Sequence, residues 1–157
     1  TCEGAGRISE EVEHTVDIPR GVEDGHAIRI PAQGEIGEDL PGDLYIVLHL
    51  LKHQRFERRG SDIFVRYEID METAILGGDV KVPSLNGSLS VSIPGGTQGG
   101  TTFRASGHGL PRLNGSGKGD QYVVVKVAVP VNLEKDEKRL IEEYRQLRRK
   151  SNKDDYE

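Results

Sequence analysis

The sequence is poor in several features that often reveal a protein's class at once. It has one cysteine, Cys2, no tryptophan, and aromatic residues at only 5% of its 157 positions. One cysteine cannot form an internal disulfide, so nothing indicates an oxidising compartment, and we expect a cytoplasmic location. No apolar run approaches the roughly 20 residues needed to cross a bilayer. The N-terminal residues also lack the basic and apolar regions of a signal peptide.

The charge balance excludes a general nucleic-acid binder. The net charge is −5, whereas neutralising phosphates requires clustered Lys and Arg. The basic residues at 145–150 are instead expected at the end of a helix, where they suit its dipole. The chain is 34% hydrophobic and contains 20 Gly and 7 Pro, a composition typical of a folded protein with many turns.

An internal repeat is the most informative feature of the chain. Residues 18–29, IPRGVEDGHAIR, return as residues 93–104, IPGGTQGGTTFR, at a shift of 75. Residues 41–48, PGDLYIVL, return as residues 118–125, KGDQYVVV, at a shift of 77. Two copies at so long a period favour tandem domains over a solenoid. The glycines shared by the copies, Gly21, Gly25, Gly96 and Gly100, are expected to take positive φ in tight connections.

The periodicity predicts a mostly β fold: two tandem small β-sandwich-like domains, a short helix in the second domain, and a C-terminal α-helix. Residues 63–69 and 89–93 alternate as half-buried strands, whereas residues 44–51 and 121–129 are apolar enough for central strands covered on both faces. Asp70 to Gly77 predict the short helix, with Asp70 as its N-cap and Gly77 at its end.

The last helix is expected over about 133–150, with Asn132 as its cap. Leu140, Ile141, Tyr144 and Leu147 fall on one face at helical spacing. Such a face either folds back on its own domain or pairs with a second copy, and the spacing favours neither.

Motifs for catalysis or metal binding are missing. Residues 115–119, GSGKG, lack the Ser or Thr that follows the Lys of a phosphate loop. No nucleophile elbow or His-Glu-x-x-His pair occurs, and the five histidines are scattered without ligand spacing, so we expect a non-enzyme without a metal site.

Seven ordered motifs together resemble the C-terminal region of DnaJ-type co-chaperones, in the subfamily with a zinc module. They are the segments 18–25, 42–44, 53–62, 74–78, 82–87, 93–98 and 119–120. The resemblance implies a zinc-module remnant at 1–7, C-terminal domain I at 8–69, and C-terminal domain II at 70–131. A dimerisation helix at 132–150 and a frayed tail at 151–157 complete the division.

The resemblance also implies what lies elsewhere. The zinc module of this subfamily is inserted into domain I, so the opening helix and strand of that domain are expected before Thr1. Cys2 is then a leftover zinc ligand, and zinc is expected only in the full-length protein. The J-domain of the family is not found in these residues.

The implied function is capture of extended apolar segments of non-native client polypeptides, for delivery to a DnaK-type chaperone. The client pocket would fall on two strands of domain I, with Val16 and Ile46 as its leading candidates; its residues are His14, Val16, Ile18, Leu44, Ile46 and Leu48. The alternative is that these residues are simply core. The last helix would form a homodimer through Leu140, Ile141, Tyr144 and Leu147.

Two other functions remain open at this point. The β domains could be an adaptor that binds a folded partner, such as the acidic tail of a chaperone. They could also form a β-sandwich enzyme, for which a cleft with paired carboxylates is required.

Overall fold

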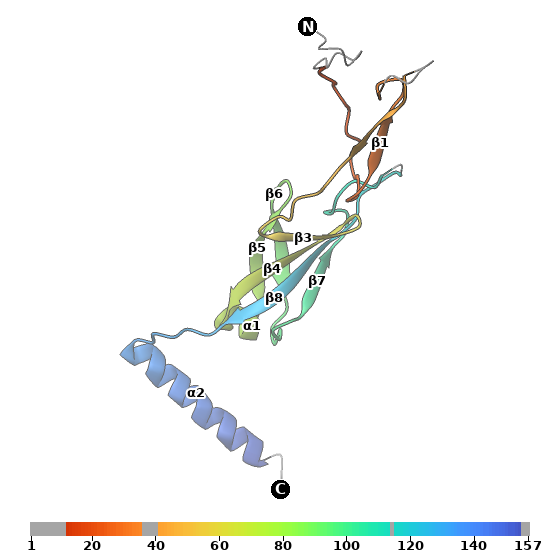
Figure 1. Ribbon diagram of the computed structural model, residues 1–157. Coiled ribbons are helices and arrows are strands. Elements are labelled where there is room, and N and C mark those ends of the chain that lie inside the picture. Colours follow the sequence, from red (N-terminus) through yellow and green to blue (C-terminus); the bar gives the residue numbers. More distant parts are fainter. Residues whose placement is uncertain (1–11, 36–40, 114, 155–157) are drawn as a thin grey trace.

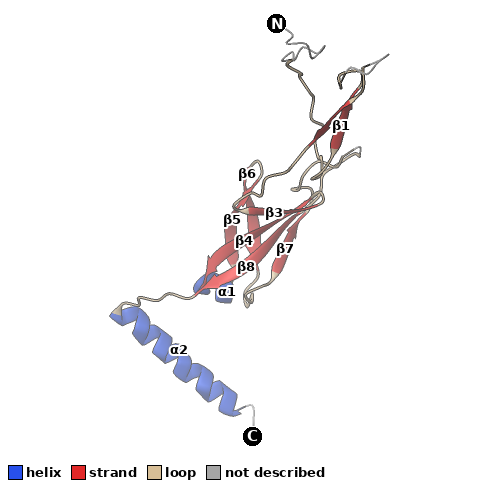
Figure 2. Ribbon diagram, in the orientation of Figure 1, coloured by secondary structure: helices blue, strands red, loops and turns tan. Residues whose placement is uncertain are grey.

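The fold is an extended row of a small sheet, a larger β unit and a separate helix (Figure 1). The computed structural model describes residues 12–35, 41–113 and 115–154, with side-chain burial to residue 151. Figure 2 shows strands in both β parts, most of them in the larger one, which confirms the mostly β prediction. The elements are β1 (Ala27–Ile30), β2 (Leu44–Val47), β3 (Phe56–Arg59), β4 (Asp62–Asp70), α1 (Met71–Leu76), β5 (Gly78–Ser84), β6 (Gly87–Ile93), β7 (Thr102–Ala105), β8 (Gln121–Ala128) and α2 (Lys135–Asp154).

The N-terminal unit, residues 12–55, contains one antiparallel pair, β1 with β2. The prediction of a central strand over 44–51 is wrong. The strand ends at Val47 and its residues alternate between half-buried and exposed, with Tyr45 60% and Val47 51% exposed. Residues 44–51 are mostly apolar, but the described residues do not cover both faces of this strand.

The C-terminal unit, residues 56–131, is built on a four-stranded sheet in the order β3-β4-β8-β7. Its central strands, β4 and β8, are parallel and pair from Ile63 with Gln121 to Asp70 with Ala128. The β5–β6 hairpin packs against this sheet, because Val82 lies in one buried cluster with Val65 and Val123. The alternation predicted for residues 63–69 and 89–93 is confirmed, as is the central place of β8.

The sheet joins residues on both sides of the domain boundary drawn at 69 and 70 from the sequence. β3 and all of β4 except Asp70 precede that boundary, yet β4 is paired with β8 from Ile63 to Asp70. We therefore place β3 and β4 in the C-terminal unit. The repeat could not show this, because these strands have no counterpart among residues 12–55.

Both helices occur close to where the pattern put them, with different caps. Asp70 occupies the N-cap position of α1 but makes no side-chain capping bond. The α2 helix begins at Lys135, not Leu133, and Asn132 does not cap it. Instead the backbone N–H of Glu134 donates to the carboxylate of Glu137 at 2.8 Å, a capping-box type of contact.

The two units are structural copies where the repeat predicts it. The N–H of Gly25 donates to the carbonyl of Leu48 at 2.8 Å, and the N–H of Gly100 donates to that of Val125 at 2.7 Å. The predicted positive φ is found at all four shared glycines. β1 with β2 is thus the counterpart of β7 with β8, in the same register.

A pair of repeat-related isoleucines tests this packing. Ile93 is 2% exposed in the core, and its counterpart Ile18 is 60% exposed. Ile93→Ala should lower the free energy of unfolding by about 2–5 kcal/mol, because it leaves a cavity. Ile18→Ala should change it by less than about 0.5 kcal/mol. Urea unfolding followed by circular dichroism measures both, and equal losses would contradict the assigned core.

Candidate functional site

A repeated Arg–Asp pair shapes the hairpin end of each unit. In the N-terminal unit the Arg29 guanidinium donates to Asp43 at 2.6 Å, and the N–H of Ala32 donates to the same carboxylate at 3.1 Å. In the C-terminal unit Arg104 donates to Asp120 at 2.7 Å, and the N–H of Gly107 does so at 2.8 Å. Each carboxylate thereby ties a strand to the turn that follows it.

The same contacts perturb both carboxyl groups. The hydrogen bond from the Gly107 N–H, followed by the Arg104 guanidinium, holds the pKa of Asp120 below its ordinary value. The N–H of Ala32 and the guanidinium of Arg29 lower the pKa of Asp43 in the same way. Both carboxylates are therefore used in holding turns. The sequence signal for these pairs was present in the repeat, but the sequence analysis missed it.

The predicted pocket residues of β2 correspond to core residues of the C-terminal unit. At the shift of 77, Leu44, Ile46 and Leu48 align with Gln121, Val123 and Val125. The latter three are at most 2% exposed because β4 flanks them and the β5–β6 hairpin covers them. Leu44, Ile46 and Leu48 are only half-buried. The N-terminal unit thus carries a face with core chemistry that the described residues leave partly uncovered.

One edge of β2 has no partner strand among the described residues. β8 pairs with β7 on one side and β4 on the other, whereas β2 pairs with β1 alone among the described strands. The second edge therefore presents backbone N–H and C=O groups that a further strand can bind.

The predicted strand over 14–18 is not found. At the shift of 75, His14, Val16 and Ile18 align with Leu89, Val91 and Ile93 of β6, which is a strand because it pairs with β5. Residues 14–18 have no such partner among the described residues and form no strand. Val16 is half-buried, while His14 and Ile18 are exposed. The structure therefore does not assemble these residues with β2 into a closed pocket.

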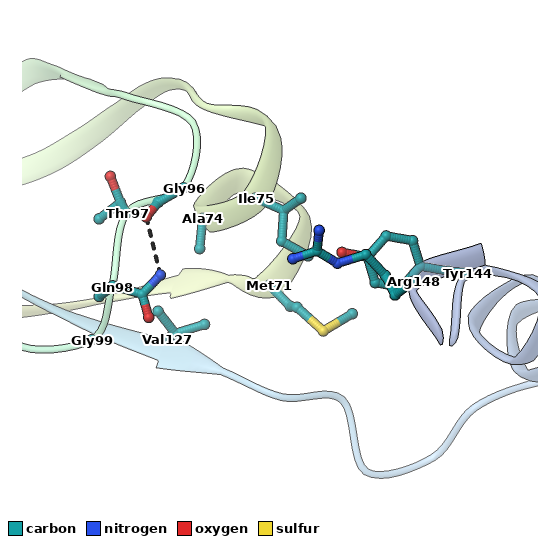
Figure 3. A pocket seen from close by; sticks show the side chains of 10 residues that line it. All are labelled: Met71, Ala74, Ile75, Gly96, Thr97, Gln98, Gly99, Val127, Tyr144 and Arg148. Carbon is teal, nitrogen blue, oxygen red and sulfur yellow. Dashed lines mark hydrogen bonds between the residues drawn. The ribbon is translucent and has the colours of Figure 1, made fainter. Parts of the chain in front are cut away.

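The predicted apolar face of α2 is present, and it is largely exposed among the described residues. Its members, Leu140, Ile141, Tyr144 and Leu147, are 40–65% exposed. Figure 3 shows Tyr144 and Arg148 facing a hollow of about 400 Å³, which Met71 and Ile75 of α1 also line. These two α1 residues were not among the predicted site residues, because the sequence signals for this helix were its terminal residues, Asp70 and Gly77.

A metal centre is not formed by the described residues. No three His, Cys, Asp or Glu side chains gather within residues 12–35, 41–113 and 115–154. Cys2 lies outside the described residues. No described helix is long and apolar enough to cross a membrane.

These features define a protein of two sibling β units and a separate amphipathic helix. Apolar surface is exposed on the N-terminal unit and on the helix. The family model for the DnaJ C terminal domain matches residues 6–130. The chain belongs to this family, which confirms the resemblance found in its motifs.

Curated relatives agree with this assignment. The chain is 44% identical to a "Chaperone protein DnaJ" of Parageobacillus thermoglucosidasius over 149 residues, which are 94% of this chain and 39% of that protein. Relatives of the same name from Leptospira biflexa and Bacillus cytotoxicus are 43% and 42% identical, over 92% of this chain and 39% and 40% of theirs. The chain thus spans about two fifths of the length of these relatives.

The Asp120 contacts predict a pH dependence. Because the pKa of Asp120 is lower in the folded state, its contribution to stability is present above about pH 4 and is lost as the pH falls through the folded-state pKa. Asp120→Asn should therefore be less stable than the parent chain at pH 7, with a difference that shrinks below pH 4. Urea unfolding from pH 7 to pH 3 measures it. Asp79→Asn, at an exposed position on β5, is the control. A difference that does not vary with pH would contradict the assignment.

Proposed function

We propose that this chain is the client-binding and dimerising part of a co-chaperone. It holds extended apolar segments of non-native polypeptides on its N-terminal unit, dimerises through α2, and delivers clients to a DnaK-type chaperone. We place this activity in the cytoplasm. The family membership supports the general role, and the observation that carries the client-binding proposal is the open edge of β2 beside its partly uncovered apolar face.

An open edge and an apolar face together suit binding with little sequence preference. A bound segment adds as a strand along β2, so its backbone supplies most of the hydrogen bonds, whatever its sequence. Ile46 and its neighbours Leu44 and Leu48 then contact one or two apolar side chains. In the C-terminal unit the corresponding position beside β8 is occupied by β4. The N-terminal unit accordingly offers a place that is shaped for a strand.

Dimerisation provides a second client-binding site, which compensates for the weak contact at each one. An apolar stripe on α2 is largely exposed among the described residues, and it consists of Leu140, Ile141, Tyr144 and Leu147. Pairing of two copies through this stripe presents two client sites, and two sites bound by one polypeptide raise its overall affinity.

The proposal includes neither catalysis nor a cofactor in this chain. Asp43 and Asp120, the two carboxylates with lowered pKa, accept hydrogen bonds from Arg and backbone N–H groups and so serve a structural role. We propose zinc only for the full-length protein, with Cys2 as the remnant of a ligand set.

An adaptor that binds a folded partner is the second candidate, because the same open edge also accepts the extended tail of a chaperone. An aggregation assay separates the two. A chain that delays aggregation of a denatured test protein and binds apolar peptides is a client binder. A chain that does neither, yet retains a folded chaperone, is an adaptor.

Two neighbouring residues on opposite faces of β2 test the client surface. Ile46→Ser should weaken binding of an extended apolar peptide about 5- to 30-fold, which corresponds to roughly 1–2 kcal/mol of lost apolar contact. Val47→Ser, on the other face of the same strand, should leave affinity within about twofold, because Val47 does not contact the peptide. Fluorescence anisotropy of a labelled peptide measures both. Equal losses, or a loss only with Val47→Ser, would place the client elsewhere.

A charge on the apolar stripe of α2 tests the dimer. Tyr144→Glu should raise the dimer dissociation constant at least about tenfold, because it introduces a charge into the interface. Gln146→Glu adds the same charge on the opposite side of the helix and should leave the dimer intact. Analytical ultracentrifugation gives the solution mass. A monomeric parent chain, or a dimer that survives removal of residues 132–157, would contradict dimerisation through α2.

A further inference from the structure

The two β units meet at a small contact that the proposed function does not require. Val22 is 8% exposed, and it is the one buried residue among those described in the N-terminal unit. The residue before it, Gly21, lies against the loop of residues 111–113 in the C-terminal unit. The best-buried part of the N-terminal unit is therefore at its contact with the other unit.

Gly21 approaches this loop more closely than any other residue type could. A Cβ atom placed on Gly21 would lie 2.4 Å from the carbonyl oxygen of Pro111 and 2.9 Å from the backbone nitrogen of Leu113. These are backbone atoms, so they cannot move aside as the end of a side chain would. The glycine thus permits a backbone-to-backbone approach between the two units.

Arg58 of β3 makes a polar contact across the same place. Its guanidinium donates through Nη2 to the Gly21 carbonyl at 3.1 Å, and through Nε to the Gly60 carbonyl at 2.7 Å. The second bond fixes the guanidinium within the C-terminal unit. The contact with Gly60 therefore orients the Arg58 guanidinium toward Gly21.

The receiving loop is itself held to the C-terminal sheet. The N–H of Leu110 donates to the Ser61 carbonyl at 2.8 Å, and the N–H of Gly119 donates to the Leu110 carbonyl at 2.9 Å. Pro111 forms an isolated bridge with Lys118. The surface that Gly21 meets is thus tied to the turn between β3 and β4.

The repeat supplies an internal comparison for Gly21. Its counterpart Gly96 has nearly the same backbone conformation, with φ of 82° against 86° for Gly21. A Cβ atom on Gly96 would meet nothing within 4 Å. The turn alone therefore requires positive φ at this position, and the close approach is an additional property of Gly21.

We propose that Gly21, Val22, Arg58 and residues 111–113 form a fixed joint that sets the orientation of the N-terminal unit on the C-terminal unit. The joint makes the two units move as one body, with Arg58 and Gly21 as positioning residues. If the chain dimerises through α2 as proposed above, this joint also sets how far apart the two client-binding units stand.

Spin-label distances within the intact 157-residue chain test the joint. In a Cys2→Ser background, Gln33→Cys places one label near the β1–β2 hairpin and Ser90→Cys places the other on exposed β6. An excess of unlabelled chain ensures that the distances measured by pulsed electron resonance lie within one copy. The parent chain should give one narrow distance distribution.

The variants then separate the joint from the turn. Gly21→Ala should broaden and shift this distribution, whereas Gly96→Ala, with the same backbone strain, should leave it unchanged. Arg58→Gln should also broaden the distribution, while Arg59→Gln, which removes a guanidinium paired with Glu57 instead, should not. Circular dichroism checks that each variant is folded. If Gly21→Ala unfolds, the comparison of Arg58→Gln with Arg59→Gln tests the joint.

A broad distribution in the parent chain would overturn the joint. Equal broadening by Gly21→Ala and Gly96→Ala would do so as well, because the effect would then belong to the turn. The distances do not depend on client binding or dimerisation, so their result stands apart from the outcome for the proposed function.

Discussion

The parallel pairing of β4 with β8 is the constraint on which the C-terminal unit depends. It aligns residues 58 positions apart, from Ile63 with Gln121 to Asp70 with Ala128, and so creates the central pair of the sheet. Val65 and Val123 meet across this pair and receive Val82 from the β5–β6 hairpin. The α1 helix follows β4 directly and adds Ala74 to the second buried cluster. Without β4, the unit would have neither a central sheet nor a core.

The N-terminal unit shows what the same motif is like without that pairing. It has the antiparallel strand pair, the glycine connection and the Arg–Asp contact of its sibling. It has no described strand on the edge of β2 opposite β1, and residues equivalent to core positions, such as Ile46 and Ile18, are half-buried or exposed. The physical basis of the proposed client binding is this difference between two copies of one motif. A segment that adds to β2 would occupy the place that β4 takes beside β8.

The sequence predicted the features that local pattern or repetition determines. Alternation predicted the faces of β4 and β6, the terminal residues Asp70 and Gly77 predicted α1, and helical spacing predicted α2. It could not predict that β3 and β4 belong with β8, since parallel pairing joins distant residues and leaves no local signature. The sequence also predicted a strand over residues 14–18, which is not found because such a strand needs a partner strand to stabilise it. The candidate site remains a prediction for the same reason, because its completion depends on what lies beside β2.

Hydrogen exchange read by mass spectrometry tests the central claim most directly. The chain is compared alone and with a saturating extended apolar peptide, and amide protection is followed segment by segment. The account predicts that protection rises over residues 44–48, which include β2, while β4 and β8, already paired in the sheet, change little. Protection that rises only along α2 or in the C-terminal unit, or nowhere, would contradict it.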